Sequence, residues 1–315
     1  MKTLIIAGGS GFLGQVLTDY FKNKVEQIYI LSRSNHVSHK TSTEAQVKEK
    51  GNIQFLPWDA KTLGPWSAYL EDADVLINMT GKSVDCRYHQ KNRDLILSSR
   101  VDATRILGQA IMQCERPPKV WLNSSTATIY RHSTDLEMDE TDGEIGEGFS
   151  VSVAQAWEKE FFSYALPKTR QVALRTSIVL GKEGGAFVPI KRLTQLGFGG
   201  KQGPGNQKVS WIHEEDFARS IEFILQKKEI QGVINIVSPT PTTNAQLMQT
   251  LRKKIGIPFG IPMGKSMLEL GAKIIQTETE LILKSRNVIP KKLIEYGFTF
   301  NYPKLDETLT HLLKS

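Results

Sequence analysis

Seven short apolar runs recur along most of the chain, and each has the length of a β-strand. They cover residues 4–7, 27–31, 53–56, 75–79, 120–123, 172–174 and 233–237. Their apolar residues are continuous and do not alternate with polar ones, which indicates strands buried on both faces. Helix-length segments separate several of these runs, at residues 11–24, 92–114 and 152–164. This order predicts an α/β fold, a doubly wound parallel sheet of the Rossmann type.

Two stretches depart from this rhythm. Residues 34–51 are polar and contain several lysines, which predicts a surface excursion between the second and third strands. Beyond about residue 240 the apolar runs give way to a segment punctuated by proline and glycine at 255–264, followed by amphipathic patterns. We therefore expect a main domain over residues 1–240, with lobe-forming loops at about 176–210, and a smaller C-terminal lobe over residues 241–315.

The composition changes this picture little. The chain has 315 residues, of which 40% are hydrophobic and 23% charged, and this excludes disordered and collagen-like chains. Forty Lys and Arg against 33 Asp and Glu leave a formal charge of +7. The basic residues are scattered among acidic ones, and no helix-turn-helix, RNP-like or zinc-finger pattern occurs, so we expect no nucleic-acid partner. The surplus suits a phosphate-rich ligand.

Cysteine content and apolar run length bear on the compartment. Cys86 and Cys114 are the only cysteines, too few for a disulfide framework or a thiolate zinc site. No apolar run approaches the ~20 residues that a membrane span needs. The first run is too short for a signal peptide and stops at a glycine cluster. These features predict a cytoplasmic location, with neither a metal site nor a membrane partner.

A glycine-rich loop directly follows the first predicted strand and opens the first predicted helix. It consists of Gly8, Gly9, Ser10, Gly11, Phe12, Leu13 and Gly14. In such a loop one glycine permits the tight turn, one lets the backbone approach a pyrophosphate, and the third lets the helix pack closely. The N-terminus of the helix adds free N–H groups and the positive end of its dipole. The loop predicts that residues 1–240 are a dinucleotide-binding domain.

The end of the second strand indicates which dinucleotide is bound. NAD enzymes usually place an acidic residue here to hold the ribose 2′-hydroxyl. This chain has Ser32 and Arg33, and a guanidinium can pair with a 2′-phosphate through two hydrogen bonds. We therefore predict NADP(H) as the cofactor, against the alternative that Arg33 is a solvated surface charge.

Other polar residues follow the third and fourth strands, at the edge where open parallel sheets bind ligands. Asp59 follows the third strand and is a candidate acceptor for the adenine amino group. Thr80 and Gly81 follow the fourth and are candidates to lie beside the nicotinamide ribose. Each of these residues also fits a role as a cap or turn residue.

These motifs together resemble a known family. The chain is similar to the extended and atypical short-chain dehydrogenase/reductases, and within them to the epimerase family subgroup that carries a distinct C-terminal domain. The resemblance rests on residues 8–14, 78–81, 98–104, 123–130, 156–158, 210–216 and 288–300. It implies a Rossmann domain, a nicotinamide cofactor and a homodimer formed through the helices predicted at 92–114 and 152–164.

The resemblance also implies catalytic roles. In related enzymes a Ser or Thr after the fifth strand bonds the reacting carbonyl, and Thr126 matches it. A Tyr followed four residues later by Lys is expected one helix further on, but residues 149–155 contain neither. Without that pair, proton transfer loses about 10²–10⁴-fold unless another group substitutes. Candidate substitutes are Tyr130, His132 and His213, and we expect water or Tyr130 to handle the proton. Arg100 is expected either to reach the cofactor or to pair with an acid.

Candidate substrate contacts come from three places. Asp85, Arg87 and Tyr88 lie on the loop after the fourth strand, and Arg175 leaves the sixth strand. His213, in the Trp-Ile-His motif, is expected mainly to shape the substrate lobe.

Two functions follow from these residues. The first is an NADP(H)-dependent oxidoreductase or epimerase acting on a small molecule, anionic or sugar-like. The alternative is a non-catalytic NADP(H)-binding sensor or scaffold whose occupancy governs a partner protein. The glycine loop and Arg33 support both, and the missing Tyr and Lys favour the second.

Overall fold

The computed structural model describes residues 1–33, 49–274 and 278–314. The surface excursion predicted at residues 34–51 therefore lies, apart from its last three residues, outside the described part of the chain. Within the described residues, eight strands form the main sheet in the order β11-β7-β6-β5-β1-β2-β4-β3. Neighbouring strands are parallel except for the short edge strand β3, which is antiparallel to β4.

The seven predicted strands are all present in this sheet. The strands are β1 (Thr3–Ala7), β2 (Gln27–Ser32), β3 (Glu49–Lys50), β4 (Ile53–Pro57), β5 (Val75–Asn78), β6 (Val120–Thr126), β7 (Arg170–Thr176) and β11 (Gly232–Ile236). Two further pairs are small: β8 (Ile178–Leu180) with β10 (Trp211–His213), and β9 (Lys208–Val209) with β12 (Thr242–Thr243).

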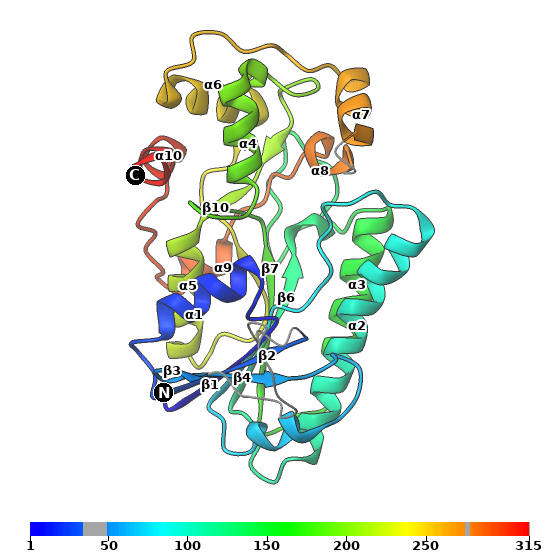
Figure 1. Cartoon of the computed structure of the whole chain (residues 1–315), viewed down its shortest axis with the longest axis vertical. Coiled ribbons are helices and arrows are strands. Elements are labelled where there is room, and N and C mark those ends of the chain that lie inside the picture. Colours follow the sequence, from blue (N-terminus) through cyan, green and yellow to red (C-terminus); the bar gives the residue numbers. More distant parts are fainter. Residues whose placement is uncertain (34–48, 275–277, 315) are drawn as a thin grey trace, which may run out of the picture.

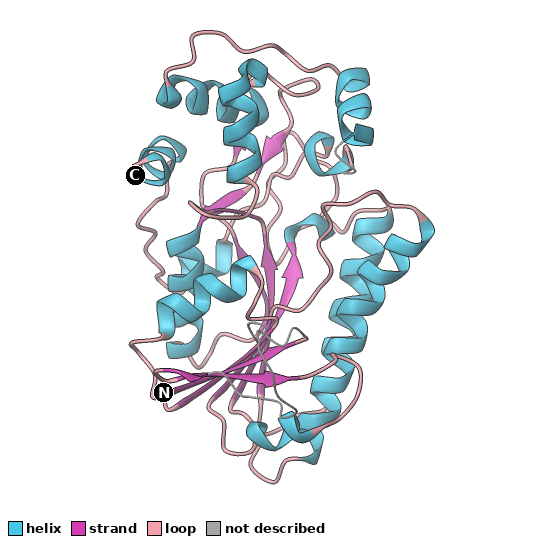
Figure 2. Ribbon diagram, in the orientation of Figure 1, coloured by secondary structure: helices cyan, strands magenta, loops and turns pink. Residues whose placement is uncertain are grey.

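The helices cover both faces of the sheet (Figure 1, Figure 2). The helices are α1 (Phe12–Phe21), α2 (Gln90–Gln113), α3 (Phe149–Phe161), α4 (Phe187–Leu193), α5 (Glu214–Gln226), α6 (Asn244–Ile255), α7 (Lys265–Ile274), α8 (Glu280–Leu283), α9 (Lys291–Glu295) and α10 (Leu305–Leu313). Shorter helical turns are η1 (Pro65–Leu70), η2 (Ala127–Ile129) and η3 (Thr194–Phe198). The predicted doubly wound α/β fold is confirmed.

Successive residues of a buried strand point to opposite faces, and β1 shows the consequence. Leu4 and Ile6 lie in the core that includes residues of α1 and α5, whereas Ile5 and Ala7 lie in the core that includes residues of α2 and α3. Since both faces are buried, the strands need apolar residues at every position. This explains why the apolar runs of the sequence do not alternate.

A lobe of helices and small sheets stands beyond the carboxyl ends of the strands (Figure 1). It contains α4, η3, α6, α7 and α8. The last part of the chain then returns to the main sheet, where Leu293 of α9 and Phe298 join the same core as Leu4. The predicted boundary at residue 240 stays a prediction, because residues beyond it pack in both places. No helix of the described chain is long and apolar enough to cross a bilayer.

Candidate cofactor and substrate site

The glycine loop lies where the order of the strands reverses. β1 pairs with β2 on one side and β5 on the other, and open parallel sheets bind ligands at such a point. Gly8 follows β1 with a φ of +77°, a conformation that favours glycine. A Cβ there would lie 2.9 Å from backbone atoms of Met79 and Thr80, which follow β5. Gly8 therefore allows the two loops to meet.

The other glycines of the loop have contrasting surroundings. A Cβ on Gly14 would overlap the Cα of Gly9 and lie 2.6 Å from the carbonyl oxygen of Gly8, so Gly14 is needed for α1 to pack on the loop. A Cβ on Gly11 would meet only the Gly8 oxygen, at an ordinary distance of 3.5 Å. The space in front of Gly11 is therefore open within the described structure.

That open space faces the start of α1. Gly11 is the N-cap residue, it offers no side chain to cap the helix, and the first turn holds no acidic residue. The N–H groups of Phe12, Leu13 and Gly14 belong to this first turn, where helices leave donors unsatisfied and carry positive partial charge. These residues fit the pyrophosphate of a dinucleotide.

Thr80 offers a second indication of a ligand. Its backbone N–H donates to Asn78 Oδ1 at 3.0 Å, and Asn78 Nδ2 in turn donates to Asn123 Oδ1 at 2.7 Å. The Thr80 hydroxyl, by contrast, is buried and has no hydrogen-bond partner within the described residues. Such a group costs stability unless something bonds it. A ribose hydroxyl would satisfy it.

Ser32 and Arg33 lie beside the glycine loop at the end of β2. The buried Ser32 hydroxyl donates to Ser10 Oγ at 3.4 Å. Arg33 follows directly and is exposed. Its charge is therefore placed at the edge where the predicted 2′-phosphate would lie.

The carboxylate of Asp59 bonds to its own turn at the end of β4. Its Oδ1 accepts from the N–H groups of Lys61 and Thr62 at 2.8 Å, and its Oδ2 accepts from the Thr62 hydroxyl at 2.6 Å. The Thr62 hydroxyl, followed by the two N–H groups, lowers the pKa of Asp59 to about 2. The capping role is thus present, and the adenine contact stays a prediction.

Arg100 projects from α2 against Gly81. A Cβ on Gly81 would lie 3.0 Å from its guanidinium carbon, and Nη1 donates to the carbonyl oxygens of Lys82 and Ile96 at 3.0 and 2.9 Å. Burial lowers the pKa of Arg100 to about 10. No salt bridge joins it to an acid of the described chain, and its guanidinium lies over the Trp157 ring, 5.1 Å from the centroid. Its contact with the cofactor stays a prediction.

Thr126 ends β6 and caps η2. Its hydroxyl accepts from the Thr128 N–H at 3.1 Å, and an accepting hydroxyl keeps its own proton to donate. Two cations converge next to it, because Arg286 Nε donates to Thr128 Oγ1 and Lys284 Nζ to the Thr128 carbonyl oxygen, each at 3.1 Å. Burial lowers the pKa of both Arg286 and Lys284. Neither cation was predicted from the sequence, because both precede the motif at residues 288–300 in a segment with no periodic pattern.

Tyr130 and Arg175, predicted to face the ligand, bond to each other inside the protein. The Tyr130 hydroxyl accepts from Arg175 Nη1 at 2.9 Å and donates to Asn235 Oδ1 at 3.0 Å. Arg175 also forms two hydrogen bonds of 2.8 Å with Glu158. Tyr130 is 1% exposed, and burial raises its pKa. Since its hydroxyl is fully engaged, we leave Tyr130 out of the proton transfer and treat Arg175 as structural.

His213 is likewise bonded within the fold. It is 1% exposed and caps α5, its Nδ1 accepting from the Glu215 N–H at 2.9 Å. The proton must then be on Nε2, which donates to His311 Nδ1 of α10 at 3.0 Å. Tyr302 stacks on the ring, with centroids 3.9 Å apart. His213 therefore joins β10 and α5 to the C-terminal helix α10, and its role in shaping a substrate lobe stays a prediction.

The His213 pair predicts a loss of stability in mild acid. Burial, followed by the charge of His311, lowers the pKa of His213 to about 3, whereas an unfolded histidine titrates near 6.5. The unfolded state therefore binds more protons, and the free energy of unfolding falls as the pH drops below about 6.5, by roughly 2 kcal/mol at pH 5. Urea unfolding at pH 7.5 and 5.0 measures this loss.

His213→Asn is the matched variant for that measurement. Asparagine preserves an N-cap acceptor for the Glu215 N–H but does not titrate. Its free energy of unfolding should therefore differ between the two pH values by about 2 kcal/mol less than that of the wild type. An equal pH dependence in both proteins would show that another group causes the acid sensitivity.

Asp85, Arg87 and Tyr88 lie on the loop between β5 and α2, and Asp85 is exposed. Arg87 lies 3.5 Å from Glu278 Oε1, which also accepts from the Tyr88 N–H at 2.6 Å. The Tyr88 side chain reaches the start of α3, where its ring packs against Phe149 and it lies close to the side chain of Ser150. The structure thus places Tyr88 beside the helix where the catalytic Tyr was expected.

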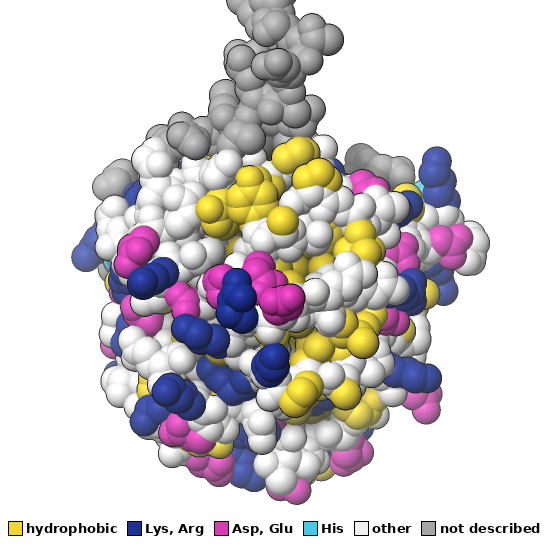
Figure 3. All heavy atoms as spheres, turned by 90° about the horizontal axis from the view of Figure 1, so that it is seen from below, with side chains coloured by type: hydrophobic (Ala, Val, Ile, Leu, Met, Phe, Trp, Pro, Cys, Tyr) yellow, Lys and Arg dark blue, Asp and Glu magenta, His cyan; other side chains and the backbone are white. Residues whose placement is uncertain are grey.

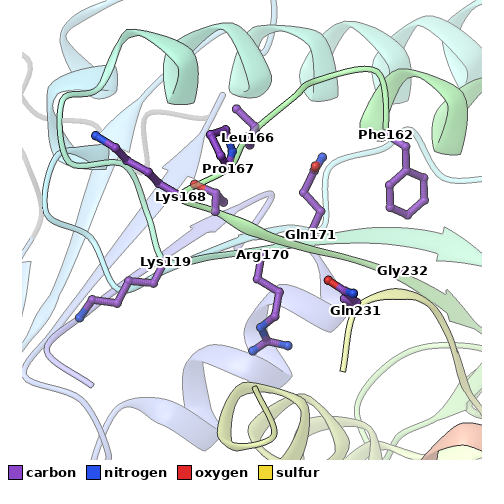
Figure 4. Close-up of a pocket in the computed structure, with 10 residues that line it drawn as sticks. Lys119, Phe162, Leu166, Pro167, Lys168, Arg170, Gln171, Gln231 and Gly232 are labelled. Atoms are coloured by element: carbon purple, nitrogen blue, oxygen red, sulfur yellow. The ribbon is translucent and has the colours of Figure 1, made fainter. Parts of the chain in front are cut away.

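A separate pocket of about 600 Å³ opens at the opposite edge of the sheet, where β6, β7 and β11 begin (Figure 4). Its cations are engaged: Lys119 pairs with Asp74 at 2.6 Å, and Arg170 donates to the carbonyl oxygens of Ile224 and Ile230. Basic side chains alternate with acidic ones on the face that Figure 3 shows. Neither this pocket nor the charged face is a stronger candidate for the functional site than the carboxyl ends of the strands.

Comparison with known proteins bears on the family. The model of the NAD dependent epimerase/dehydratase family matches residues 4–237, and that of a domain of unknown function, DUF1731, matches residues 265–312. The epimerase family protein YfhF of Bacillus subtilis is 32% identical over 313 residues, with 98% of this chain and 97% of that protein covered. The mouse epimerase family protein SDR39U1 (Mus musculus) is 28% identical, with 97% and 98% covered.

A solved structure agrees with these sequence matches. The crystal structure of human epimerase family protein SDR39U1 with NADPH superposes with a TM-score of 0.82 and 26% identity, and covers 98% of both chains. The family match extends over the glycine loop, the edge that carries Thr126 and the strands that position both. The chain therefore belongs to the NAD dependent epimerase/dehydratase family.

Proposed function

We propose that this chain binds NADPH at the glycine loop and acts as an oxidoreductase or epimerase on a small anionic or sugar-like molecule. The observation that carries the proposal is the open space in front of Gly11 at the uncapped start of α1, because a phosphate-binding loop needs that space. The buried, unbonded hydroxyl of Thr80 supports it. So does the human relative, whose structure contains NADPH.

The residues divide into cofactor and substrate contacts. The cofactor contacts we propose are Gly8, Gly9, Ser10, Gly11, Phe12, Leu13, Gly14, Ser32, Arg33, Asp59, Thr80, Gly81 and Arg100. NADPH, when bound, supplies a hydride to a carbonyl carbon. The Thr126 hydroxyl donates to the carbonyl oxygen and so holds it in place. Lys284 and Arg286 converge on Thr128, and buried cations at that position favour an anionic group on the substrate.

Arg33→Asp tests the choice of cofactor. Losing a charge-assisted pair with the 2′-phosphate should weaken NADPH binding by about tenfold or more, while NADH, which has no 2′-phosphate, loses little. Isothermal titration of both nucleotides gives the ratio of dissociation constants. Lys168→Asp makes the same change of charge at the opposite edge of the sheet and should preserve the wild-type ratio. An unchanged ratio in Arg33→Asp would remove Arg33 from the site.

The non-catalytic sensor is the second candidate, and the absence of Tyr and Lys from residues 149–155 favours it. The two functions differ in turnover. If the protein is an enzyme, the absorbance of NADPH at 340 nm should fall when wild-type protein and NADPH are mixed with a panel of aldehydes, ketones and quinones. Thr126→Ala should slow that reaction without changing NADPH affinity. Tight binding with no consumption across the panel would favour the sensor.

Two further expectations accompany this function. Leu95, Leu97 and Met112 of α2 are 41%, 38% and 63% exposed, which supports a homodimer formed through α2 and α3. Cys86 and Cys114 are both free thiols, which suits a reducing compartment such as the cytoplasm.

A further inference from the structure

A phenol lies at the start of α3 although α3 itself has none. α3 begins at Phe149, and Ser150 occupies one of the positions at which related enzymes place their catalytic Tyr. The side chain of Tyr88 lies close to that of Ser150. The Tyr88 ring also packs edge-on against Phe149, with centroids 5.1 Å apart. The loop between β5 and α2 thus places a tyrosine hydroxyl at the start of α3, where α3 itself has no tyrosine.

The backbone holds this phenol in place from both sides. The Tyr88 N–H donates to Glu278 Oε1 at 2.6 Å, and its carbonyl oxygen accepts from Arg93 Nε at 2.9 Å. Arg93 in turn lies over the Phe149 ring, 4.8 Å from its centroid. The residue is only half-buried, so part of its side chain remains accessible to a ligand.

The surroundings of Tyr88 connect the two halves of the proposed site. Its hydroxyl interacts electrostatically with Arg100, which lies against Gly81 on the cofactor side. It interacts in the same way with Arg286, which bonds Thr128 on the Thr126 side. One guanidinium near the phenol therefore lies against Gly81, and the other bonds to Thr128.

The protonation state of Tyr88 suits a proton donor. Burial raises its pKa, the nearby side chain of Ser150 opposes that change, and the charges of Glu280, Cys86 and Glu278 add to it. Arg100 and Arg286 face the phenol from α2 and from the segment after α8. The group therefore carries its proton at neutral pH, and the two guanidinium groups can stabilise the anion formed when the proton leaves.

We propose that Tyr88 is the catalytic acid that replaces the missing phenol of α3, donating its Oη proton to the carbonyl oxygen held by Thr126. This inference rests on the proposed function. As the carbonyl carbon gains the hydride and its two electrons, the C–O π bond breaks and the oxygen takes the Tyr88 proton. The tyrosinate then recovers a proton from water, so carbonyl, NADPH and one proton give alcohol and NADP⁺. In the reverse direction the tyrosinate is the base.

The first test detects contact with the cofactor and does not depend on turnover. The chain has eight tyrosines, and labelling them with carbon-13 at Cζ gives one NMR resonance for each. The resonance that is missing from the spectrum of Tyr88→Phe is that of Tyr88. Adding NADP⁺ should move that resonance, because the nicotinamide ring would lie beside the phenol. Adenosine 2′,5′-bisphosphate, which lacks the nicotinamide, should leave it in place. If the chemical shift of the Tyr88 resonance does not change when NADP⁺ binds, the inference is overturned, whereas the cofactor assignment stands.

The second test separates catalysis from positioning. Tyr88→Phe keeps the ring against Phe149 and removes only the hydroxyl. With NADPH and 9,10-phenanthrenequinone as the probe carbonyl, kcat should fall about 10²–10⁴-fold, with the KM for NADPH within about twofold. Tyr164→Phe is the control, because that hydroxyl bonds Arg105 and Glu160 at the far end of α3 and should not affect kcat.

The possible outcomes distinguish a failure of this inference from a failure of the proposed function. A wild-type kcat in Tyr88→Phe, with NADPH still oxidised, overturns the role of Tyr88 and preserves the proposed function. Wild-type protein that binds no NADP(H), or that binds it and reduces no carbonyl probe, overturns the enzymatic function and this inference with it.

Discussion

Gly14→Ala is expected to abolish measurable NADPH binding and to lower the free energy of unfolding by about 2–3 kcal/mol. The added Cβ would overlap the Cα of Gly9 and lie 2.6 Å from the Gly8 oxygen. Both are backbone atoms, so α1 must move away from the loop and the phosphate site opens. Urea unfolding and isothermal titration with NADPH measure the two losses.

Gly11→Ala is the matched variant, since it adds the same methyl group three residues earlier. Its Cβ would meet one atom, the Gly8 oxygen, at 3.5 Å, and the φ of −79° and ψ of 167° at this position suit alanine. The free energy of unfolding should therefore stay within about 0.5 kcal/mol of the wild type. NADPH affinity should still fall tenfold or more, because the methyl group projects into the pyrophosphate space. Unchanged affinity would move the phosphates away from this loop.

Glu158→Ala is expected to cost about 3–5 kcal/mol of stability. Glu158 and Arg175 are 12% and 10% exposed at their side chains and form two bonds of 2.8 Å. Burial acts to lower the pKa of Arg175, but the bond to Glu158 and its charge more than offset this, so the pKa is raised. Without Glu158 the guanidinium is a buried charge, and among the described residues only the Tyr130 hydroxyl still accepts a hydrogen bond from it. Urea unfolding at neutral pH gives the change.

The double variant Glu158→Leu with Arg175→Met separates an unpaired charge from lost packing. Replacing both partners by apolar residues of similar size leaves no buried charge, so this protein should be more stable than Glu158→Ala. If the two variants are equally destabilised, the loss comes from packing around α3 rather than from the ion pair.

The fold and the glycine loop could be predicted because their signals are local. Strands buried on both faces need continuous apolar runs, and a phosphate loop needs glycines at fixed spacing next to a strand and a helix. Gly14 meets its partners, Gly8 and Gly9, within the loop itself, so the motif specifies how α1 packs on the loop. Arg33 could likewise be placed at the ligand edge, because it ends a recognisable strand.

The proton donor could not be chosen in the same way. Tyr130 and Tyr88 both follow strands at the ligand edge, and nothing in either local sequence separates them. The distinction comes from distant partners: Tyr130 meets Asn235, 105 residues away, whereas Tyr88 meets Ser150 of α3. Lys284 and Arg286 reach Thr128 across 156 and 158 residues.

The sequence alone therefore determined the doubly wound sheet, the glycine loop and the edge of the sheet at which we propose that a ligand binds. Periodicity and spacing encode these features, because each depends on residues close together in the chain. The tertiary structure decided which polar side chains at that edge are bonded internally and are therefore left out of the proposed site. A hydroxyl or guanidinium forms an internal hydrogen bond only when a partner is packed against it. That partner comes from a segment that is distant in the sequence.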